Sequence, residues 1–421
     1  MTLSLSEVVE RIGQRAVSAS RIVAQATTAE KNEALLAIAG RIEQETQKIL
    51  TANAADLRAG SESGLSSAML DRARLDPKRI QAMANSVREV VNLTDPIGEV
   101  LKEWSRPNGL RISKRRVPIG VIGIIYESRP NVTSDAASLC LKAGNAVILR
   151  GGSEAIRSNM AIAEAVSDGC MDAGLPEYSV QLVPSTDRGA VTLMAQLDRY
   201  IHLIIPRGGR SLIEAVTSAA RMPVIKHFDG ICAAYVDRAA DLRMAEQIVV
   251  NAKCQRPGVC NAIETMLVHA EVARQFLPGC AEALWQRGVE LRGDPLTQEI
   301  LGAKVFPATE EDWRTEYLDL FLAIKTVRNL EEAVEHIENY GSHHSDAIIT
   351  GDRIAAQKFM NQVDSAAVFW NASTRFNDGG EFGFGAEIGI STDRLHARGP
   401  MGLEELTSYK YLVEGTGQVR A

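Results

Sequence analysis

Two cysteines, Cys254 and Cys260, lie six positions apart in the stretch NAKCQRPGVCNA, residues 251–262. A cysteine thiolate is a nucleophile that attacks acyl carbons, so these residues are the first candidates for chemistry in the chain. Cys260 follows a Pro-Gly turn and precedes the apolar run AIETMLVH. At such a turn the side chain can project into a cleft while the residue's own amide N–H binds an oxyanion. The alternative is a small buried apolar residue, which is what most free cysteines are.

Cys254 is the weaker candidate, because it closes the helical pattern ADLRMAEQIVVNAKC. The carbonyl groups at a helix C-terminus raise the pKa of a thiol. The six cysteines of the chain show no regular short spacing, and its seven histidines include one adjacent pair, His343 and His344, whose side chains would point apart on a strand. We therefore expect free thiols, no disulfide framework and no metal site.

Two glycine pairs follow apolar runs in the first half of the chain. They are Gly151-Gly152, after AVILR, and Gly208-Gly209, after LIIPR. Each pair lies where a strand pattern changes to a helical pattern, and exposed amides at such turns bind phosphate. Neither pair has the G-x-G-x-x-G spacing of dinucleotide sites, so glycines that only permit the turn are the alternative. Arg150 and Ser153 add a cation and a hydroxyl, which suit the 2′-phosphate of NADPH.

The elements that must position these residues follow from hydrophobic patterning. Residues 3–95 predict successive helices, and residues 98–120 predict a projecting β-hairpin around Asn108-Gly109. Apolar runs then alternate with helical patterns, which predicts a parallel sheet covered on both faces, and a second α/β unit begins near residue 250. The runs of the first sheet are VIGIIYE (121–127), AVILRGG (146–152), SVQLVPS (179–185) and YIHLIIPRGG (200–209).

Length and charge limit the class of protein. A chain of 421 residues is too long for one core and predicts two or three domains. A formal net charge of −7 argues against a nucleic-acid-binding surface. No apolar run approaches the roughly 18 residues that cross a bilayer, and the N-terminus lacks the pattern of a signal peptide. We expect a soluble cytoplasmic protein that binds neither nucleic acid nor membrane.

Five motifs, in order along the chain, carry a resemblance to a known family. VPIGVIGIIYESRPNV and LKAGNAVILRGGSEA resemble the cofactor domain of the aldehyde dehydrogenase superfamily, and RPGVCNAIETMLVH takes the place of its catalytic cysteine. More narrowly, YESRPNV, LRGGSEA, IPRGG, VCNAIETMLVH and HIENYGSHHSDAIIT resemble the γ-glutamyl phosphate reductase family, the glutamate-5-semialdehyde dehydrogenases of proline biosynthesis. The resemblance spans nearly the whole chain.

The resemblance implies an aldehyde dehydrogenase-like α/β fold with a small β oligomerisation element. The NADPH-binding domain would comprise residues 1–97 and 118–249, and the catalytic domain residues 250–375. The oligomerisation hairpin and tail would be residues 98–117 and 400–421. The same resemblance implies a homo-oligomer, dimer or tetramer, and makes glutamate 5-kinase a candidate partner.

The implied chemistry is NADPH-dependent reduction of L-glutamyl 5-phosphate. Cys260 would attack the acyl carbon, phosphate would leave, and the thioester would accept hydride to give glutamate 5-semialdehyde. The Cys260 amide and the Asn131 side chain would bind the oxyanion. Arg129, Arg256 and Lys226 are the candidate cations for the substrate's carboxylate and phosphate.

One stretch departs from the superfamily pattern. Oxidising members hydrolyse the thioester with a glutamate, whereas KHFDGICAAYVD, residues 226–237, contains none. This suits a reductase, because a general base there would activate water before hydride arrives. Family members usually carry histidine after the cysteine of this stretch, where this chain has Ala233. A CoA-acylating aldehyde dehydrogenase and a non-catalytic scaffold with a degenerate dehydrogenase fold are the alternatives.

Overall fold

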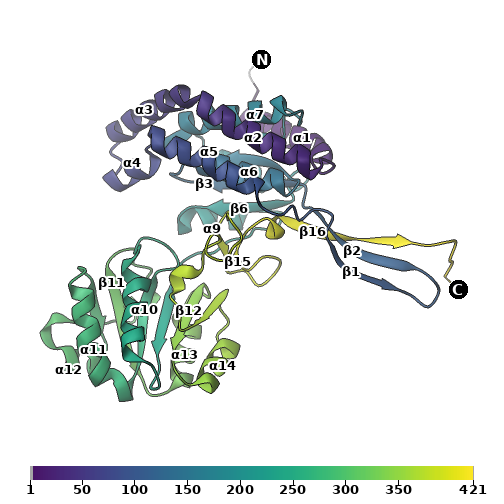
Figure 1. Ribbon diagram of the computed structural model, residues 1–421. Coiled ribbons are helices and arrows are strands. Elements are labelled where there is room, and N and C mark those ends of the chain that lie inside the picture. Colours follow the sequence, from purple (N-terminus) through teal and green to yellow (C-terminus); the bar gives the residue numbers. More distant parts are fainter. Residues whose placement is uncertain (1–2, 421) are drawn as a thin grey trace. The chain divides into compact units, whose positions relative to one another are not determined.

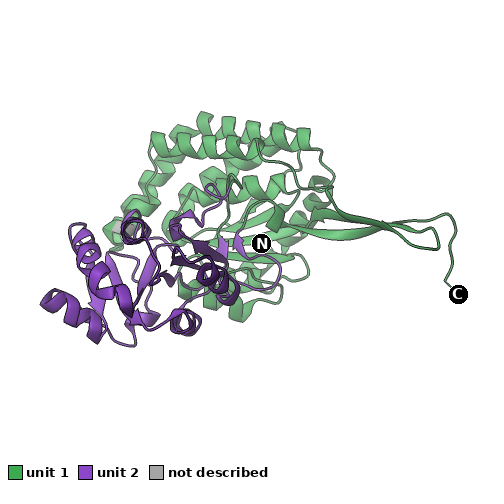
Figure 2. Ribbon diagram, turned by 60° about the horizontal axis from the view of Figure 1, so that its bottom comes forward, with its two compact units in different colours: residues 1–226, 383–389, 401–421 green, residues 227–382, 390–400 purple. Residues whose placement is uncertain are grey.

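The computed structural model describes residues 3–420, which form two compact units (Figure 2). Unit 1 comprises Met1–Lys226, Gly383–Gly389 and Met401–Ala421. Unit 2 comprises His227–Phe382 and Ile390–Pro400. None of the described helices is both long enough and apolar enough to cross a membrane.

Unit 1 contains a parallel sheet of four strands in the order β5-β4-β3-β6 (Figure 1). The strands are β3 (Val121–Tyr126), β4 (Ala146–Arg150), β5 (Val180–Leu182) and β6 (Leu203–Arg207). The sheet is buried on both faces, as the continuous apolar runs predict. The helices of this unit are α1 (Leu5–Val23), α2 (Thr28–Gln44), α3 (Thr46–Glu62), α4 (Ser67–Ala73), α5 (Pro77–Val91), α6 (Val132–Lys142), α7 (Ile156–Asp172), α8 (Gly189–Ala195) and α9 (Arg210–Ala219).

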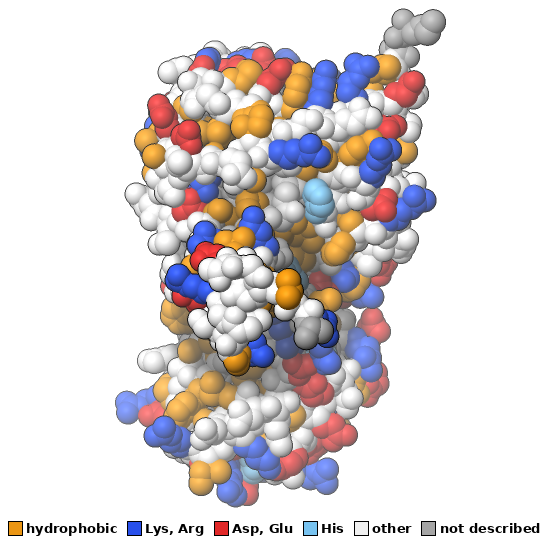
Figure 3. Space-filling model, turned by 90° about the vertical axis from the view of Figure 1, so that its right-hand side faces the viewer, with side chains coloured by type: hydrophobic (Ala, Val, Ile, Leu, Met, Phe, Trp, Pro, Cys, Tyr) orange, Lys and Arg blue, Asp and Glu red, His pale blue; other side chains and the backbone are white. Residues whose placement is uncertain are grey.

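A separate three-stranded antiparallel sheet projects from unit 1 (Figure 1). The strands β1 (Val100–Ser105) and β2 (Arg111–Pro118) form the expected hairpin, with Gly109 at a φ of 87° in its turn. Strand β16 (Thr407–Glu414) pairs with β2 along its whole length. Figure 3 looks at this sheet from its tip and shows basic and hydrophobic side chains around it.

Unit 2 contains a parallel sheet of seven strands in the order β10-β9-β11-β8-β7-β12-β13. They are β7 (Cys232–Val236), β8 (Ile263–His269), β9 (Glu290–Gly293), β10 (Phe306–Pro307), β11 (Phe321–Val327), β12 (Ser345–Ile349) and β13 (Ala367–Trp370). The helices are α10 (Leu242–Cys254), α11 (Ala270–Trp285), α12 (Pro295–Leu301), α13 (Leu330–Tyr340) and α14 (Arg353–Gln362). A two-stranded sheet joins β14 (Ile390–Ser391) to β15 (Gly399–Pro400). The 3-10 turns of the chain are η1 (Ser153–Ala155), η2 (Gly302–Lys304), η3 (Asp312–Arg314), η4 (Thr374–Phe376) and η5 (Glu404–Leu406).

Strand β7 shows why the two faces of this sheet differ. Cys232, Ala234 and Val236 lie in the apolar cluster that α10 and α11 cover. Ala233 and Tyr235 alternate with them and lie in the cluster that α13 and α14 cover. The expected boundary between the two domains, at residues 249 and 250, falls inside α10. Unit 2 begins earlier, at His227, because β7 forms its hydrogen bonds with β8 and β12 of the second sheet.

Candidate active site

Cys260 lies in unit 2, in the turn between α10 and β8, where its side chain is half-buried. The buried thiol of Cys232 donates a hydrogen bond of 3.1 Å to the Cys260 carbonyl oxygen. A side chain at Gly230 would meet the same turn, since a methyl group there would lie 2.5 Å from the Cys260 Cα. Only glycine permits this close approach, and the segment before β7 therefore packs directly against the backbone of the Cys260 turn.

Two imidazoles accompany the Cys260 thiol. One ring nitrogen of His227, one of His344 and the Cys260 Sγ all lie within 4.8 Å of one another. The two rings meet edge to face, with their centroids 5.5 Å apart. Burial, together with the nearby His227, lowers the pKa of His344 well below its usual value, so this ring is neutral. The site therefore brings a thiol and two imidazoles together from positions far apart in the sequence.

The ring orientation of each histidine follows from its other nitrogen. His227 Nδ1 lies 2.7 Å from the carbonyl oxygen of Ile390 and donates to it, because a carbonyl only accepts. His344 Nδ1 lies 2.8 Å from Ser345 Oγ. His344 Nε2 is buried and has no hydrogen-bond partner among the described residues.

The residues after His344 fall on both faces of the sheet. Ser345 accepts a hydrogen bond of 2.7 Å from Asn377. Asp346 lies on the opposite face, where it accepts from the Ala233 amide, and burial raises its pKa to about 7. The position where the family usually has histidine, Ala233, therefore faces away from Cys232 and belongs to the core beneath α13 and α14.

Arg375, in η4, is a cation that the sequence analysis did not select. It donates hydrogen bonds to Asn261 Oδ1 and to Gln255 Oε1. Burial and the neighbouring Arg256 lower the pKa of Arg375, whereas negative charge on Cys260 raises it. Arg375 is thus within electrostatic reach of the Cys260 thiol, and the exposed Arg256 lies near it. Local sequence offered no signal for Arg375, because it is more than 100 residues from Cys260.

The carboxylates near this turn are engaged with protein groups. Lys253 and Glu264 form a fully buried ion pair of 2.5 Å, and burial raises the pKa of Glu264 to about 7 although Lys253 opposes the shift. Glu316 accepts a hydrogen bond of 2.8 Å from the Gly230 amide. Cys254, at the end of α10, has its pKa raised chiefly by burial, in line with its weaker candidacy.

Three of the six predicted cofactor residues line a cavity of about 800 Å³ in unit 1. Arg150 ends β4 and lines the cavity with Gly152 and Ser153. Arg150 is 6% exposed, burial lowers its pKa, and its Nε has no hydrogen-bond partner among the described residues. An orphaned donor of this kind fits a site for an anionic ligand such as a nicotinamide dinucleotide.

The other three predicted glycines, Gly151, Gly208 and Gly209, are not among the residues that line this cavity. Gly151 approaches the side chain of Asn159, where a methyl group would lie 2.9 Å from Cγ. Gly208 and Gly209 precede α9, whose Ser211 and Leu212 line the cavity. The Gly209 amide donates to Glu127 at 3.0 Å, so the start of α9 already binds one carboxylate.

Three further predicted residues also lie in unit 1. Asn131 precedes α6, and its side-chain amide donates a hydrogen bond of 2.8 Å to Asp135. Arg129 is exposed two residues earlier, and Lys226 is the last residue of the first segment of unit 1. Unit 1 therefore contains Asn131, Arg129 and Lys226, whereas unit 2 contains Cys260 and Arg256.

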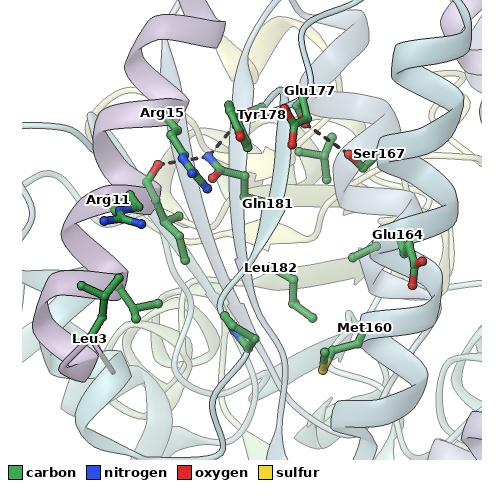
Figure 4. Close-up of a pocket in the computed structure, with 15 residues that line it drawn as sticks. Leu3, Arg11, Arg15, Met160, Glu164, Ser167, Glu177, Tyr178, Gln181 and Leu182 are labelled. Carbon is green, nitrogen blue, oxygen red and sulfur yellow. Dashed lines mark hydrogen bonds between the residues drawn. The ribbon is translucent and has the colours of Figure 1, made fainter. Parts of the chain in front are cut away.

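A second cavity of unit 1, of about 490 Å³, lies between α1, α7 and β5 (Figure 4). Arg15 stacks on the ring of Tyr178 at its rim, with 4.3 Å between the guanidinium carbon and the ring centroid. Its lining is largely apolar and includes none of the predicted site residues. The Cys260 turn and the Arg150 cavity, in contrast, each contain predicted site residues.

The fold and the thiol site define a class of protein. A model described as "Aldehyde dehydrogenase family" matches residues 2–305, and the chain belongs to this family. The chain is 57% identical over 413 residues to γ-glutamyl phosphate reductase of Moorella thermoacetica, covering 98% of each chain. It is 55% identical over 408 residues to the protein of that name from Clostridium botulinum (strain Eklund 17B / Type B), covering 97% of this chain and 98% of the relative.

A solved structure agrees with these sequence relatives. The crystal structure of γ-glutamyl phosphate reductase from Thermotoga maritima matches with a TM-score of 0.96 and 49% identity. The match covers 98% of this chain and 100% of that chain. The resemblance that the five motifs indicated is confirmed, and so is the expected aldehyde dehydrogenase fold.

Proposed function

We propose that this protein reduces L-glutamyl 5-phosphate to glutamate 5-semialdehyde and phosphate, with NADPH as reductant, in proline biosynthesis. The observation that carries the proposal is near-full-length identity of 57% to a γ-glutamyl phosphate reductase. The geometry around Cys260 supports it, because a half-buried thiol lies beside two imidazoles and within reach of an arginine. This combination suits acyl transfer to a thiolate.

Cys260 is the proposed nucleophile. Its thiol must first lose a proton, and His227 is the proposed base, since it lies close to the thiol while burial keeps His344 neutral. The positive charge of Arg375 favours the thiolate that results. The thiolate then attacks the acyl carbon, the carbon–oxygen bond to phosphate breaks, and phosphate leaves with the electron pair. The product of this step is a thioester on Cys260.

The oxyanion of this step needs hydrogen-bond donors. The Cys260 amide is one proposed donor, and the side chain of Asn131 is the other. The side-chain amide of Asn131 donates one N–H to Asp135. Its second N–H is the one that we propose to bind the oxyanion. Arg129, Arg256 and Lys226 remain the proposed cations for the carboxylate and the phosphate, and Arg375 joins them.

A reductase must protect its thioester from water. Glu264 is paired with Lys253, and Glu316 accepts from the Gly230 amide, so both carboxylates are held by the protein. The segment 226–237 contributes no glutamate at all. This arrangement supports a thioester that persists until it is reduced.

A bound reduced nicotinamide cofactor supplies the hydride for that reduction. The aldehyde dehydrogenase family implies such a cofactor, and we propose NADPH because Arg150 and Ser153 border the cavity of unit 1. Arg150 would donate to the 2′-phosphate, and the turns at Gly151-Gly152 and Gly208-Gly209 would admit the pyrophosphate.

The direct test is the reverse reaction. Purified protein with glutamate 5-semialdehyde and NADP⁺ should form NADPH only when inorganic phosphate is added. Activity that needs coenzyme A instead of phosphate would support a CoA-acylating aldehyde dehydrogenase. Absence of turnover with either acceptor would support the non-catalytic scaffold.

Location and assembly are part of the same proposal. We propose a cytoplasmic homo-oligomer, dimer or tetramer, with glutamate 5-kinase as a candidate partner that supplies the acyl phosphate. An unstable acyl phosphate favours a supplier that acts close by, which is the chemical reason for that partner.

A further inference from the structure

We propose that Cys260, His227 and His344 together form a binding site for a zinc ion, which holds the Cys260 thiol in an inactive state. Zinc binding itself requires only these three side chains. The inhibition that follows rests on the proposed function, in which Cys260 is the nucleophile. The three ligands come from distant positions in the chain, which is why short ligand spacings did not reveal them.

The distances suit a small adjustment to tetrahedral coordination. The three ligand atoms lie within 4.8 Å of one another. Bonds of about 2.0–2.3 Å to zinc in tetrahedral geometry separate neighbouring ligand atoms by roughly 3.3–3.7 Å. Side-chain rotations that shift the ligand atoms by about 1–1.5 Å close this difference. The half-buried His227 and Cys260 side chains can make that movement, while the buried His344 ring stays in place.

The hydrogen bonds of the two rings direct Nε2 toward the metal. His227 donates from Nδ1 to the Ile390 carbonyl, so its Nε2 has a lone pair. A histidine ligand commonly donates its other ring N–H to a carbonyl in this way. In the tautomer that donates from Nδ1 to Ser345, His344 also has a lone pair on Nε2.

The Nε2 atom of His344 is the observation that points to a ligand. It is buried, it lacks a hydrogen-bond partner among the described residues, and its ring has one nitrogen within 4.8 Å of the Cys260 Sγ. Buried polar atoms of native proteins rarely stay unsatisfied, and a bound ion is one ordinary explanation. A zinc ion would satisfy this atom directly.

The donor set selects the metal. One thiolate and two imidazoles favour zinc, while magnesium and calcium prefer oxygen ligands. Three protein ligands leave a fourth position for water. When zinc binds, the thiol proton is released and a sulfur–zinc bond forms, so the sulfur lone pair that would attack the substrate is engaged.

The test uses metal-free full-length protein without substrate. Calorimetric titration with Zn²⁺ should give one site per chain, with no competition from Mg²⁺. Cys260→Ser should weaken this binding by at least about 100-fold, and His227→Ala by at least about 10-fold, since even supporting residues of metal sites contribute 10- to 100-fold. With Co²⁺ as probe, wild-type protein should show a thiolate-to-cobalt charge-transfer band that Cys260→Ser lacks. Cys254→Ser is the matched control and should retain both signals.

Several results would decide against the site. Zn²⁺ binding that Cys260→Ser leaves unchanged would overturn the proposal, as would wild-type protein that binds no Zn²⁺ at micromolar concentration. His344→Ala should also bind weakly, and because His344 is buried, His227→Ala decides if that variant does not fold. Stoichiometric zinc binding without loss of turnover would support the site while contradicting Cys260 as nucleophile.

Discussion

At the scale of single residues, the environment of each thiol separates Cys260 from the other cysteines. Four cysteines are buried: Cys140, Cys170, Cys232 and Cys280. Burial raises the pKa of Cys170 to about 12 and that of Cys232 well above its usual value, so these thiols stay protonated. Cys260 is half-buried beside two imidazoles and within reach of Arg375. We therefore propose Cys260 as the thiol that reacts.

Cys260→Ser should abolish reduction while leaving the fold and cofactor binding intact. Serine nearly preserves the volume of the side chain and lacks a nucleophilic sulfur, so turnover should fall by at least about 1,000-fold. Cys254→Ser should keep turnover near the wild-type rate. Steady-state assays and thermal unfolding of both variants check this, and peptide mapping should find Cys260 alkylated fastest. An active Cys260→Ser enzyme, or an inactive Cys254→Ser enzyme, would contradict the mechanism.

Arg150→Ala should change the preference between cofactors. The lost charge-assisted hydrogen bond to the 2′-phosphate is worth roughly 1.5–3 kcal/mol, or about 10- to 150-fold in affinity. The KM for NADPH should rise by this factor, while the KM for NADH serves as the internal control and should change little. A wild-type enzyme that prefers NADH would refute the assignment.

At the scale of elements, hydrogen bonds between polar side chains join the turns of unit 2 to its strands. Asp312 in η3 is 4% exposed and accepts hydrogen bonds from Arg292 of β9, Tyr317 and Thr309. Burial alone would raise the pKa of Asp312, but these donors outweigh it and lower the pKa to about 2. The carboxylate is therefore held in its charged form.

Asp312→Asn should destabilise the protein in a pH-dependent way. Because the folded pKa lies below the unfolded value of about 3.8, the charged group stabilises the fold above that pH, and this stabilisation is lost as pH falls toward 2. The shift corresponds to roughly 2 kcal/mol at pH 7 and about half of that at pH 3. Urea unfolding of wild type and variant at both values measures it. An equal difference at pH 7 and pH 3 would exclude the ionised carboxylate as the cause.

At the scale of the whole molecule, the projecting sheet predicts self-association. On β16 the side chains of Tyr409, Tyr411 and Val413 share one face and are each about half exposed. Tyr411 packs edge-on against Trp104 of β1, with 6.1 Å between ring centroids. A thin sheet with this much apolar surface is marginally stable in water unless a second chain covers it.

Sedimentation should therefore show a dimer or tetramer at micromolar concentration. Replacing both Tyr411 and Val413 by glutamate places charges on the face to be covered and should shift the protein to monomers. Glu414→Gln, on the same strand, is the control and should leave assembly unchanged. A wild-type monomer at micromolar concentration would rule out this role for the sheet.

Much of the fold was predictable because local patterns carry it. The apolar runs around 121–127, 146–152 and 200–209 became β3, β4 and β6, since strands buried on both faces must be apolar throughout. The hairpin was predictable because Asn108-Gly109 provides the backbone freedom that its turn requires. The boundary between the two units was harder to predict from the sequence. The residues of β7 and α10 have the same apolar pattern whether these elements belong to the first sheet or to the second.

The sequence by itself determined the family, the parallel sheets and the glycine turns, since each depends on residues that are close together along the chain. Tertiary structure alone decided that His227, His344 and Arg375 gather around Cys260, and that β16 pairs with β2. Periodicity reports which face of an element is buried, but it does not report which distant element covers that face. Contacts between residues far apart in the chain arise only when the elements pack.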